Sequence, residues 1–319
     1  MSLGEFELIG RYFSGHDKSD AVSLGVGDDC ALLNVPQGSE LAITTDTQIE
    51  GIHFFKNTDP FLLGYKSLLV NLSDLASMGA KPIAFTLSLS LPMADENFLK
   101  GFSKGLFSLA DKHSLPLIGG NTTKGQLSIT ISAYGLVEHG RAMRRDNAKD
   151  GDDIYVTGTL GLPGFAVALG YNEITMDKSV FNECYTKSML IEDRCAFARE
   201  LSRYSKCAID ISDGLIGDLK HILDASKVGA SINLEDIPLP CEFAKYNLKE
   251  KVYDLALYGG CDYELLFTAS KCFRHNIEDI AHKFCTKVTR IGSISKNSKL
   301  QIINHGIMCN QNLKPFEHF

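Results

Sequence analysis

Several patterns that identify common classes of protein are missing from this sequence. There is no run of about 18 apolar residues, so no transmembrane helix is predicted. The first ten residues contain neither a basic segment nor an apolar one, and we expect neither a signal peptide nor a membrane anchor. We therefore expect a cytoplasmic protein that does not bind a membrane.

Cysteine pairs and an excess of positive charge are missing as well. The nine cysteines include no C-x-x-C pair, and an odd number of scattered cysteines indicates reduced thiols rather than a disulfide framework or a zinc site. The formal net charge of −7 disfavours binding to the phosphates of nucleic acid. An anionic ligand would need recruited cations, which is a first indication of a metal.

The common nucleotide-binding and catalytic signatures are missing too. The chain has no G-x-x-x-x-G-K-[ST] motif and no protein-kinase signature set, and GVGDDC is only a fragment of G-x-G-x-x-G. Neither a P-loop NTPase nor a dinucleotide-dependent dehydrogenase is predicted. No arrangement of Ser, His and Asp, or of Cys and His, indicates a covalent nucleophile.

The composition and patterning that are present predict two globular domains. A chain of 319 residues with 44% hydrophobic and 22% charged residues is long enough for two cores. Apolar periodicity vanishes between residues 139 and 153, where charge dominates, and we place the domain boundary there. The prediction is an N-terminal domain over residues 1–140 and a C-terminal domain over residues 150–319.

Alternating strand-like and helix-like segments predict a mixed α/β (α+β) class. Ile83 to Leu91 places five apolar residues on one face with period two, and Glu40 to Asp46 is a second strand. Between them, Asp59 and Pro60 begin a helix that ends near residue 79, and Lys66 on this helix is interpreted as a surface lysine. In the second half we expect strands over residues 153–158, 207–212 and 263–269, and helices over residues 192–204, 213–227, 253–258 and 276–284.

Five short stretches place carboxylates mostly at strand ends and helix starts. Hard oxygen ligands on separate loops favour Mg²⁺ over zinc or copper, and protein-bound Mg²⁺ usually bridges to phosphates. A nucleotide ligand is therefore expected. The carboxylates are Asp28 and Asp29 in GVGDDC, Asp46 beside the hydroxyls of Thr44 and Thr45, Asp74 in NLSDLA, Asp210 and Asp213 in DISDGL, and Asp262 and Glu264 in GGCDYE.

Three of these carboxylates have competing interpretations. Asp74 shares a polar stripe with Ser67 and Asn71 on an otherwise apolar helix, so it must be paired with a cation, hold a metal or take up a proton. Asp213 is typical of the N-cap of the following helix. Asp210 lies inside the predicted strand, where it could share a phosphate with the helix N–H groups through a bridging cation.

Taken in order along essentially the whole chain, these stretches resemble thiamine-monophosphate kinase. The matching segments are GEFELI, GVGDDCALL, TTDTQIEGIHF, NLSDLASMGAKP, LIGGNTT, YVTGTLG, DISDGL, GGCDYEL and the C-terminal aromatic pair in PFEHF. That family shares a superfamily with aminoimidazole ribonucleotide synthetase and selenophosphate synthetase. The resemblance implies the two-domain fold of that superfamily, with a homodimer formed through the N-terminal sheets. It also implies ATP-dependent phosphorylation of thiamine monophosphate to thiamine diphosphate, the last step in the synthesis of that cofactor.

The resemblance further implies which residues form the site. The N-terminal domain would bind ATP and Mg²⁺ and form the dimer, and the C-terminal domain would complete the nucleotide and substrate site. Several Mg²⁺ ions would be held by Asp29, Thr44, Thr45, Asp46, Asp74, Asn121, Asp210 and Asp213. ATP would contact Gly120, Asn121, Arg145 and Ser212, and thiamine monophosphate would contact His53, Cys261 and Phe316.

The implied reaction is consistent with the missing nucleophile. The acceptor is a phosphate monoester whose oxygen is already ionised, so in-line positioning and charge neutralisation would carry the transfer. Two residues depart from the family pattern, because Asn121 replaces an expected aspartate and Cys261 an expected glutamate. Both changes remove negative charge. A non-catalytic protein that binds thiamine phosphate or nucleotide therefore remains an alternative, as does another synthetase of the superfamily.

Some of the implied residues also have simpler interpretations. His53 precedes two aromatic residues and is typical of a packed or surface histidine. Arg145 belongs to a basic cluster that is either a solvated linker or a phosphate contact. The glycines of GTLGLPG either cradle a phosphate or serve only a turn. Cys261, between a glycine pair and two carboxylates, is interpreted as a substitution and not as a nucleophile.

Overall fold

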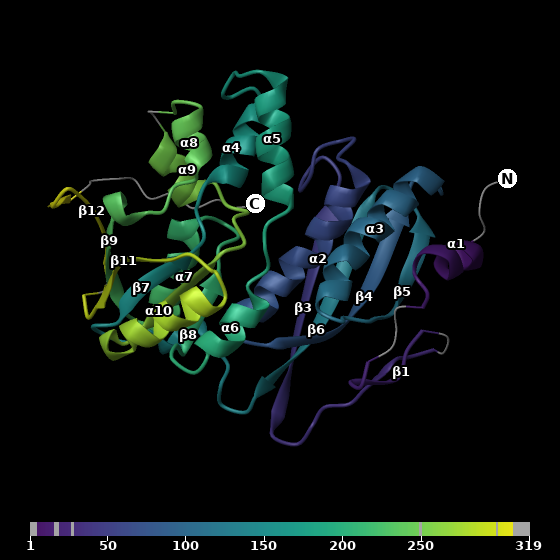
Figure 1. The fold of residues 1–319 in the computed structure, drawn as a ribbon, viewed down its shortest axis with the longest axis horizontal. Coiled ribbons are helices and arrows are strands. Elements are labelled where there is room, and N and C mark those ends of the chain that lie inside the picture. Colours follow the sequence, from purple (N-terminus) through teal and green to yellow (C-terminus); the bar gives the residue numbers. More distant parts are fainter. Residues whose placement is uncertain (1–4, 16–18, 27–28, 249–250, 298, 309–319) are drawn as a thin grey trace. The chain divides into compact units, whose positions relative to one another are not determined.

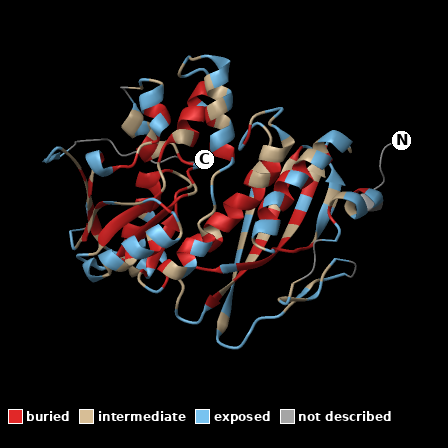
Figure 2. Cartoon of the chain, viewed as in Figure 1, coloured by how far each residue is buried: buried red, intermediate tan, exposed pale blue. Residues whose placement is uncertain are grey.

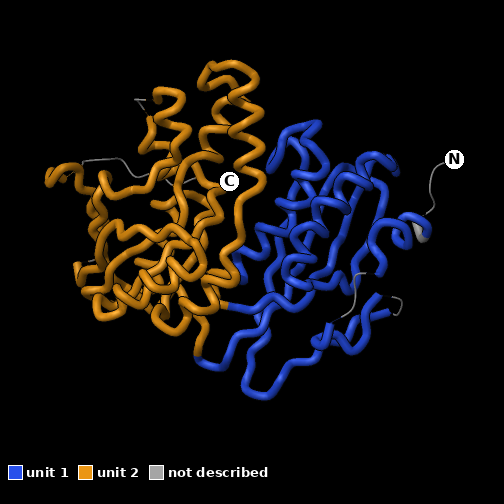
Figure 3. The backbone as a smooth tube through the Cα atoms, in the orientation of Figure 1, with its two compact units in different colours: residues 1–75, 80–140 blue, residues 76–79, 141–319 orange. Residues whose placement is uncertain are grey.

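The computed structural model describes residues 5–15, 19–26, 29–248, 251–297 and 299–308. The chain forms two compact units (Figure 3): unit 1 comprises residues 1–75 and 80–140, and unit 2 comprises residues 76–79 and 141–319. Each unit is built from helices and a sheet, so the predicted mixed α/β class is confirmed. Within the described ranges, no helix combines the length and the apolar character that crossing a membrane requires.

Unit 1 contains a four-stranded sheet in the order β3-β6-β4-β5. Strands β4 and β5 run parallel, and the other neighbours run antiparallel. The period-two apolar residues predicted for β4 are all 5% exposed or less, which confirms that strand. The strands are β3 (Ser39–Ile49), β4 (Lys81–Leu91), β5 (Leu117–Lys124) and β6 (Ser128–Glu138), and a short helix α1 (Glu5–Tyr12) and the hairpin β1 (Val22–Leu24) and β2 (Leu32–Leu33) precede them.

Two long helices, α2 (Pro60–Ser77) and α3 (Glu96–Lys112), lie over one face of this sheet (Figure 1). The predicted start of α2 is confirmed, because the Asp59 carboxylate accepts a hydrogen bond of 2.8 Å from the backbone N–H two residues later. Figure 2 shows that α2 is buried along most of its length. Lys66 is only 7% exposed, so its interpretation as a surface lysine is wrong. A helix that is apolar on nearly every side buries even its long polar side chains.

Unit 2 contains a seven-stranded sheet in the order β13-β12-β9-β11-β7-β10-β8. Strands β9 and β12 run parallel, and the other neighbours run antiparallel. Strands β7 and β10 and the edge strand β8 are buried at every residue. The strands are β7 (Asp153–Thr157), β8 (Cys207–Asp210), β9 (Gly229–Asn233), β10 (Leu265–Ala269), β11 (Val288–Ser295), β12 (Leu300–Asn304) and β13 (Ile307–Met308).

The helices predicted for unit 2 over residues 192–204, 213–227, 253–258 and 276–284 are present in that order with different bounds, whereas the helices over residues 178–189 and 241–245 were not predicted. The predicted helix over residues 192–204 is shorter, and the helix predicted from residue 213 begins two residues later. The helices are α4 (Leu162–Gly170), α5 (Lys178–Met189), α6 (Cys195–Leu201), α7 (Leu215–Ser226), α8 (Cys241–Lys245), α9 (Val252–Tyr258) and α10 (Arg274–Lys283).

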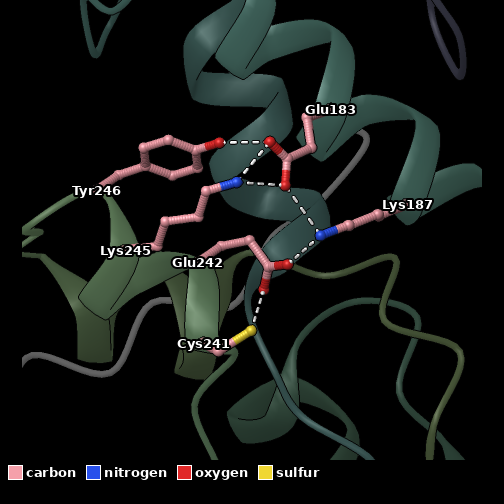
Figure 4. Close-up of polar contacts among 6 residues, drawn as sticks. All are labelled: Glu183, Lys187, Cys241, Glu242, Lys245 and Tyr246. Atoms are coloured by element: carbon pink, nitrogen blue, oxygen red, sulfur yellow. Dashed lines mark hydrogen bonds and ion pairs between the residues drawn. The ribbon is translucent and has the colours of Figure 1, made fainter.

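An ion-pair network joins α5 to α8 at one end of unit 2 (Figure 4). Glu183 accepts hydrogen bonds from Lys245, Tyr246 and Lys187, and together they lower the pKa of Glu183 to about 2. Lys187 also pairs at 2.7 Å with the buried carboxylate of Glu242. These contacts hold the short helix α8 against α5, beside a small apolar core.

Candidate functional site

The first group of predicted ligands in unit 1 is a pair of carboxylates where α2 packs on β3, with Asp74 on the helix and Asp46 on the strand. Thr44 and Asp46 lie on the same face of β3, because side chains two residues apart on a strand point the same way. The Thr44 hydroxyl donates a hydrogen bond to Asp74 on α2. Burial, and then the charge of Asp74 and a hydrogen bond to it, raise the pKa of Asp46 to about 6. Two adjacent, partly buried carboxylates disfavour being ionised together, and a cation relieves that repulsion.

Thr45 lies on the opposite face of β3. Its hydroxyl is 2.8 Å from the Ser132 hydroxyl of β6, and its side chain is exposed. The expectation that both threonine hydroxyls stand beside Asp46 is therefore wrong for Thr45. The alternation of the strand separates the two threonines, and any contact of Thr45 with the cation that Asp46 binds would have to come from its backbone.

The second group in unit 1 surrounds a cavity of about 200 Å³ next to β5. Asp29, Gly120 and Asn121 line it, whereas Asp46 and Asp74 do not. Gly120 has a φ of +149°, and a Cβ there would lie 1.8 Å from the carbonyl oxygen of Leu87 on β4. Only glycine fits so close to the neighbouring strand, which explains the second glycine of LIGGNTT.

Three further residues of the sequence analysis need separate mention. His53 is an exposed residue in the turn after β3, and its Nδ1 accepts a hydrogen bond of 3.1 Å from the Ile49 backbone N–H. It is thus a surface histidine and not part of the core. Asp28 and Phe316 lie outside the described residues.

In unit 2, the predicted residues of DISDGL lie between β8 and α7. Asp210 is the last residue of β8 and is 3% exposed. The interpretation of Asp213 as the N-cap of α7 is wrong, because Gly214 holds that position and no side chain caps the helix. Instead, the Asp218 carboxylate accepts hydrogen bonds from the backbone N–H groups of Ser212 and Asp213, at 3.0 and 3.1 Å.

Asp218 was not identified from the sequence, although it has the same signature as Asp74. It is a carboxylate inside an apolar helix and is 2% exposed. Burial, and less strongly the charge of Asp213, raise the pKa of Asp218 to about 7, whereas the charge of Arg145 lowers it. Ligand atoms of Asp213, Asp218 and His221 lie within 4.8 Å of one another. Arg145, which was predicted to contact a phosphate, therefore lies close enough for its positive charge to influence this cluster.

Cys261 lies beside Ser212, although the two residues were predicted to contact different ligands. The Cys261 backbone N–H donates a hydrogen bond of 2.7 Å to the Ser212 carbonyl oxygen, and the Tyr263 N–H donates one of 2.8 Å to that of Ile211. Cys261 has a φ of +59° and is exposed. Segments some 50 residues apart in sequence thus place one predicted ATP contact and one predicted substrate contact next to each other.

The other acidic residues of GGCDYE have structural roles. Glu264 is buried and receives two hydrogen bonds from Arg194, at 2.7 and 2.6 Å, and one from the Thr157 hydroxyl. Asp262 accepts a hydrogen bond of 2.8 Å from the backbone N–H of Gly161. Gly161 belongs to GTLGLPG, so one backbone N–H of that loop is bonded to a protein carboxylate and not to a phosphate. This favours the interpretation of the glycines as serving a turn.

Family comparisons cover most of the chain. The family model for AIR synthase related protein, N-terminal domain, matches residues 27–137, and the model for the C-terminal domain matches residues 149–304. A thiamine-monophosphate kinase of Buchnera aphidicola subsp. Schizaphis graminum is 45% identical over 302 residues, which cover 94% of this chain and 93% of that protein.

Solved structures agree with these matches. The crystal structure of a thiamine-monophosphate kinase from Stenotrophomonas maltophilia K279a has a TM-score of 0.85 and 39% identity, and the match covers 95% of this chain and 97% of that one. A structure described as AaThiL complexed with AMPPCP and TMP has a TM-score of 0.77 and 28% identity, with 90% and 89% covered. The two family models match the chain in order, and the thiamine-monophosphate kinases are similar to it along nearly their full length. The chain is therefore an enzyme of the thiamine-monophosphate kinase family.

Proposed function

We propose that this enzyme transfers the γ-phosphoryl group of ATP to thiamine monophosphate, giving thiamine diphosphate and ADP. The observation that carries the proposal is the carboxylate pair of Asp46 and Asp74, where burial and mutual repulsion raise the pKa of Asp46 to about 6. Such a pair suits a divalent cation that accompanies phosphate groups. The related structure that contains AMPPCP and TMP supports the choice of the two substrates.

The residues fit Mg²⁺ because their donor atoms are nearly all oxygens. In unit 1, Asp46, Asp74 and the Thr44 hydroxyl would hold it. In unit 2, Asp210, Asp213 and Asp218 would hold it. Mg²⁺, when bound, neutralises the charge of the phosphate oxygens and orients them for in-line transfer.

The remaining work of the protein is to bind and orient the substrates. Arg145 supplies a permanent cation beside the cluster around Asp218, where it would pair with a phosphate. Asp218 fixes the backbone at Ser212 through two hydrogen bonds, and Ser212 in turn fixes the backbone of Cys261. No general base is required, because the acceptor phosphate is already ionised near neutral pH. The chain would thus work by positioning.

We further propose a homodimer formed through the sheet of unit 1. Strand β3 is an edge strand, and its uncovered face exposes Leu41 (37%) and Ile43 (61%). Paired apolar side chains on an uncovered edge favour contact with a second copy. Ile43→Lys should shift the protein from dimer to monomer in sedimentation velocity, whereas Ile307→Lys, at a more exposed site in unit 2 (73%), should not. A wild-type monomer at micromolar concentration would contradict the dimer.

The proposed setting is the cytoplasm, where thiols remain reduced. Eight cysteines lie within the described residues, and all eight are free thiols. Burial raises the pKa of Cys207 to about 12 and that of Cys184 to about 11, so neither is a reactive thiolate. These features support a protein that functions under reducing conditions.

The test of the function is formation of thiamine diphosphate by the pure protein from ATP and thiamine monophosphate. We expect turnover with Mg²⁺ and none after chelation with EDTA. Asp74→Asn should lower the rate by orders of magnitude, whereas Glu96→Gln, which removes an exposed carboxylate of unit 1, should not. If the protein binds both substrates but forms no product, the non-catalytic alternative is correct and the proposed function is wrong.

A further inference from the structure

Asn71 on α2 is buried in a way that the proposed reaction has not yet explained. Its side chain is completely buried, and its Nδ2 donates a hydrogen bond of 3.2 Å to the Ser67 backbone carbonyl. No donor among the described residues reaches its Oδ1. A buried amide oxygen without a protein donor is destabilising. A residue that is kept at such a cost needs a partner from outside the described residues.

The contacts on either side of Asn71 define what its side chain faces. One turn before it, the Ser67 hydroxyl donates to Gln48 of β3 at 3.0 Å. Nearly one turn after it, Asp74 accepts from Thr44 of the same strand. The helix and the strand therefore run in opposite directions, with the polar stripe of α2 over the inner face of β3.

Simple geometry then places Asn71 opposite Asp46. Four helical residues separate Asn71 from Ser67, a rise of about 6 Å. Two strand residues separate Asp46 from Gln48, a rise of about 6.6 Å. Because Ser67 and Gln48 are in contact, the two steps end at the same level. The side-chain amide of Asn71 thus lies beside the pair formed by Asp46 and Asp74.

The orientation of the amide is also fixed. Nδ2 must face the Ser67 carbonyl, since two oxygens there would repel each other, so Oδ1 points away from Ser67 and toward the carboxylates. An amide oxygen beside two carboxylates adds a third acceptor to the site, and this Oδ1 itself receives no hydrogen bond from the described residues. A hydrated cation supplies what is missing, because Mg²⁺ keeps several bound waters whose hydrogens are strong donors.

We infer that Asn71 is a positioning residue of the divalent-cation site, and that its Oδ1 accepts a hydrogen bond from a water bound to the cation held by Asp46 and Asp74. This inference rests on the proposed function, since it presupposes a cation at that pair. It extends the site from its carboxylate ligands to a neutral residue that holds the hydration shell. Residues of this kind typically change metal affinity by about 10–100-fold.

The test uses Mn²⁺ alone, without nucleotide, and measures binding by the loss of the free-ion electron paramagnetic resonance signal. Asn71→Leu removes the acceptor and keeps a side chain of similar size, and it should weaken Mn²⁺ binding about 10–100-fold. Its melting temperature in EDTA should stay near that of the wild type, because the lost oxygen accepts no hydrogen bond from the described residues. Asn71→Asp keeps an acceptor and adds charge, so it should melt earlier in EDTA and bind Mn²⁺ at least as tightly as the wild type.

Ser67→Ala is the matched control on the same stripe. The Ser67 hydroxyl has partners within the protein, so its loss should lower the melting temperature in EDTA and leave Mn²⁺ affinity unchanged. If Asn71→Leu behaves like this control, Asn71 only packs α2 against β3 and the inference is wrong. If the wild-type protein itself binds no Mn²⁺, the cation site of the proposed function fails first, and the inference fails with it.

Discussion

The carboxylate pair predicts a substitution that stabilises the cation-free protein while abolishing its activity. Burial and Asp74 raise the pKa of Asp46 from 3.8 to about 6, a shift equivalent to about 3 kcal/mol at pH 8. Burial is the larger cause of the shift. Removing the charge of Asp74 should therefore recover only about 1–2 kcal/mol of the roughly 3 kcal/mol by which ionised Asp46 destabilises the folded state. Asn at position 74 keeps an oxygen that can accept the hydrogen bond from Thr44, so Asp74→Asn should preserve that contact.

Thermal unfolding in EDTA is the assay. At pH 8, Asp74→Asn should raise the melting temperature of unit 1 by about 3–8 °C. The folded wild type holds the proton of Asp46 more tightly than the unfolded chain, so wild-type stability should fall as pH rises from about 4 through 6, and the gain of the variant should vanish below that window. Mg²⁺ should stabilise the wild type but not the variant. A variant that melts earlier than the wild type in EDTA at pH 8 would refute the reasoning.

Three further predictions concern unit 2. Asp218→Asn should stabilise the cation-free protein above pH 7, where the wild-type carboxylate is forced to ionise, and not at pH 5; urea unfolding at both pH values measures this, and an unchanged difference would contradict it. Arg194→Met leaves the Glu264 carboxylate buried without its cation and should lower the free energy of unfolding by about 3–5 kcal/mol, and adding Glu264→Gln should restore most of the loss; a loss below about 1 kcal/mol would argue against a buried ion pair. Cys261→Ala should retain phosphoryl transfer and Cys261→Glu should lower the KM for thiamine monophosphate in steady-state kinetics, whereas complete loss of turnover in the alanine variant would make Cys261 a nucleophile.

Local signals in the sequence predicted the elements well where one interaction dominates. The period-two pattern of β4 and the Asp59 start of α2 depend on burial and on one capping bond, and both are confirmed. The same signals failed at Asp213, where S-D-G is typical of an N-cap. There Gly214 holds the N-cap position, and the Asp218 carboxylate of α7 instead accepts hydrogen bonds from the backbone N–H groups of Ser212 and Asp213, which precede the helix.

The arrangement of the candidate site could not be predicted, because it depends on register between elements. The sequence marked Asp46 and Asp74 as separate acidic residues, and only the packing of α2 on β3 makes them a pair. The same alternation sends Thr45 to the other face of the strand. Asp218 shows the opposite case, because a carboxylate within an apolar helix was as visible there as at Asp74.

The geometry at Cys261 explains how this position can hold a cysteine in place of the glutamate expected from the resemblance, without a change of fold. The loop is fixed by backbone groups, through the hydrogen bond from the Cys261 N–H to Ser212 and the one from the Tyr263 N–H to Ile211. Any residue other than proline can make the first bond, and the cost of its φ of +59° differs little between cysteine and glutamate. Replacement of glutamate by cysteine therefore changes what the side chain offers to a substrate and not where the loop lies. Because Ser212 is held in turn by Asp218, the position of residue 261 is tied to the acidic cluster and not to its own chemistry. In the proposed reaction, a thiol at position 261 would pair more weakly with a positively charged thiazolium than a carboxylate would, so we predict a lower substrate affinity with the phosphoryl-transfer groups left in place.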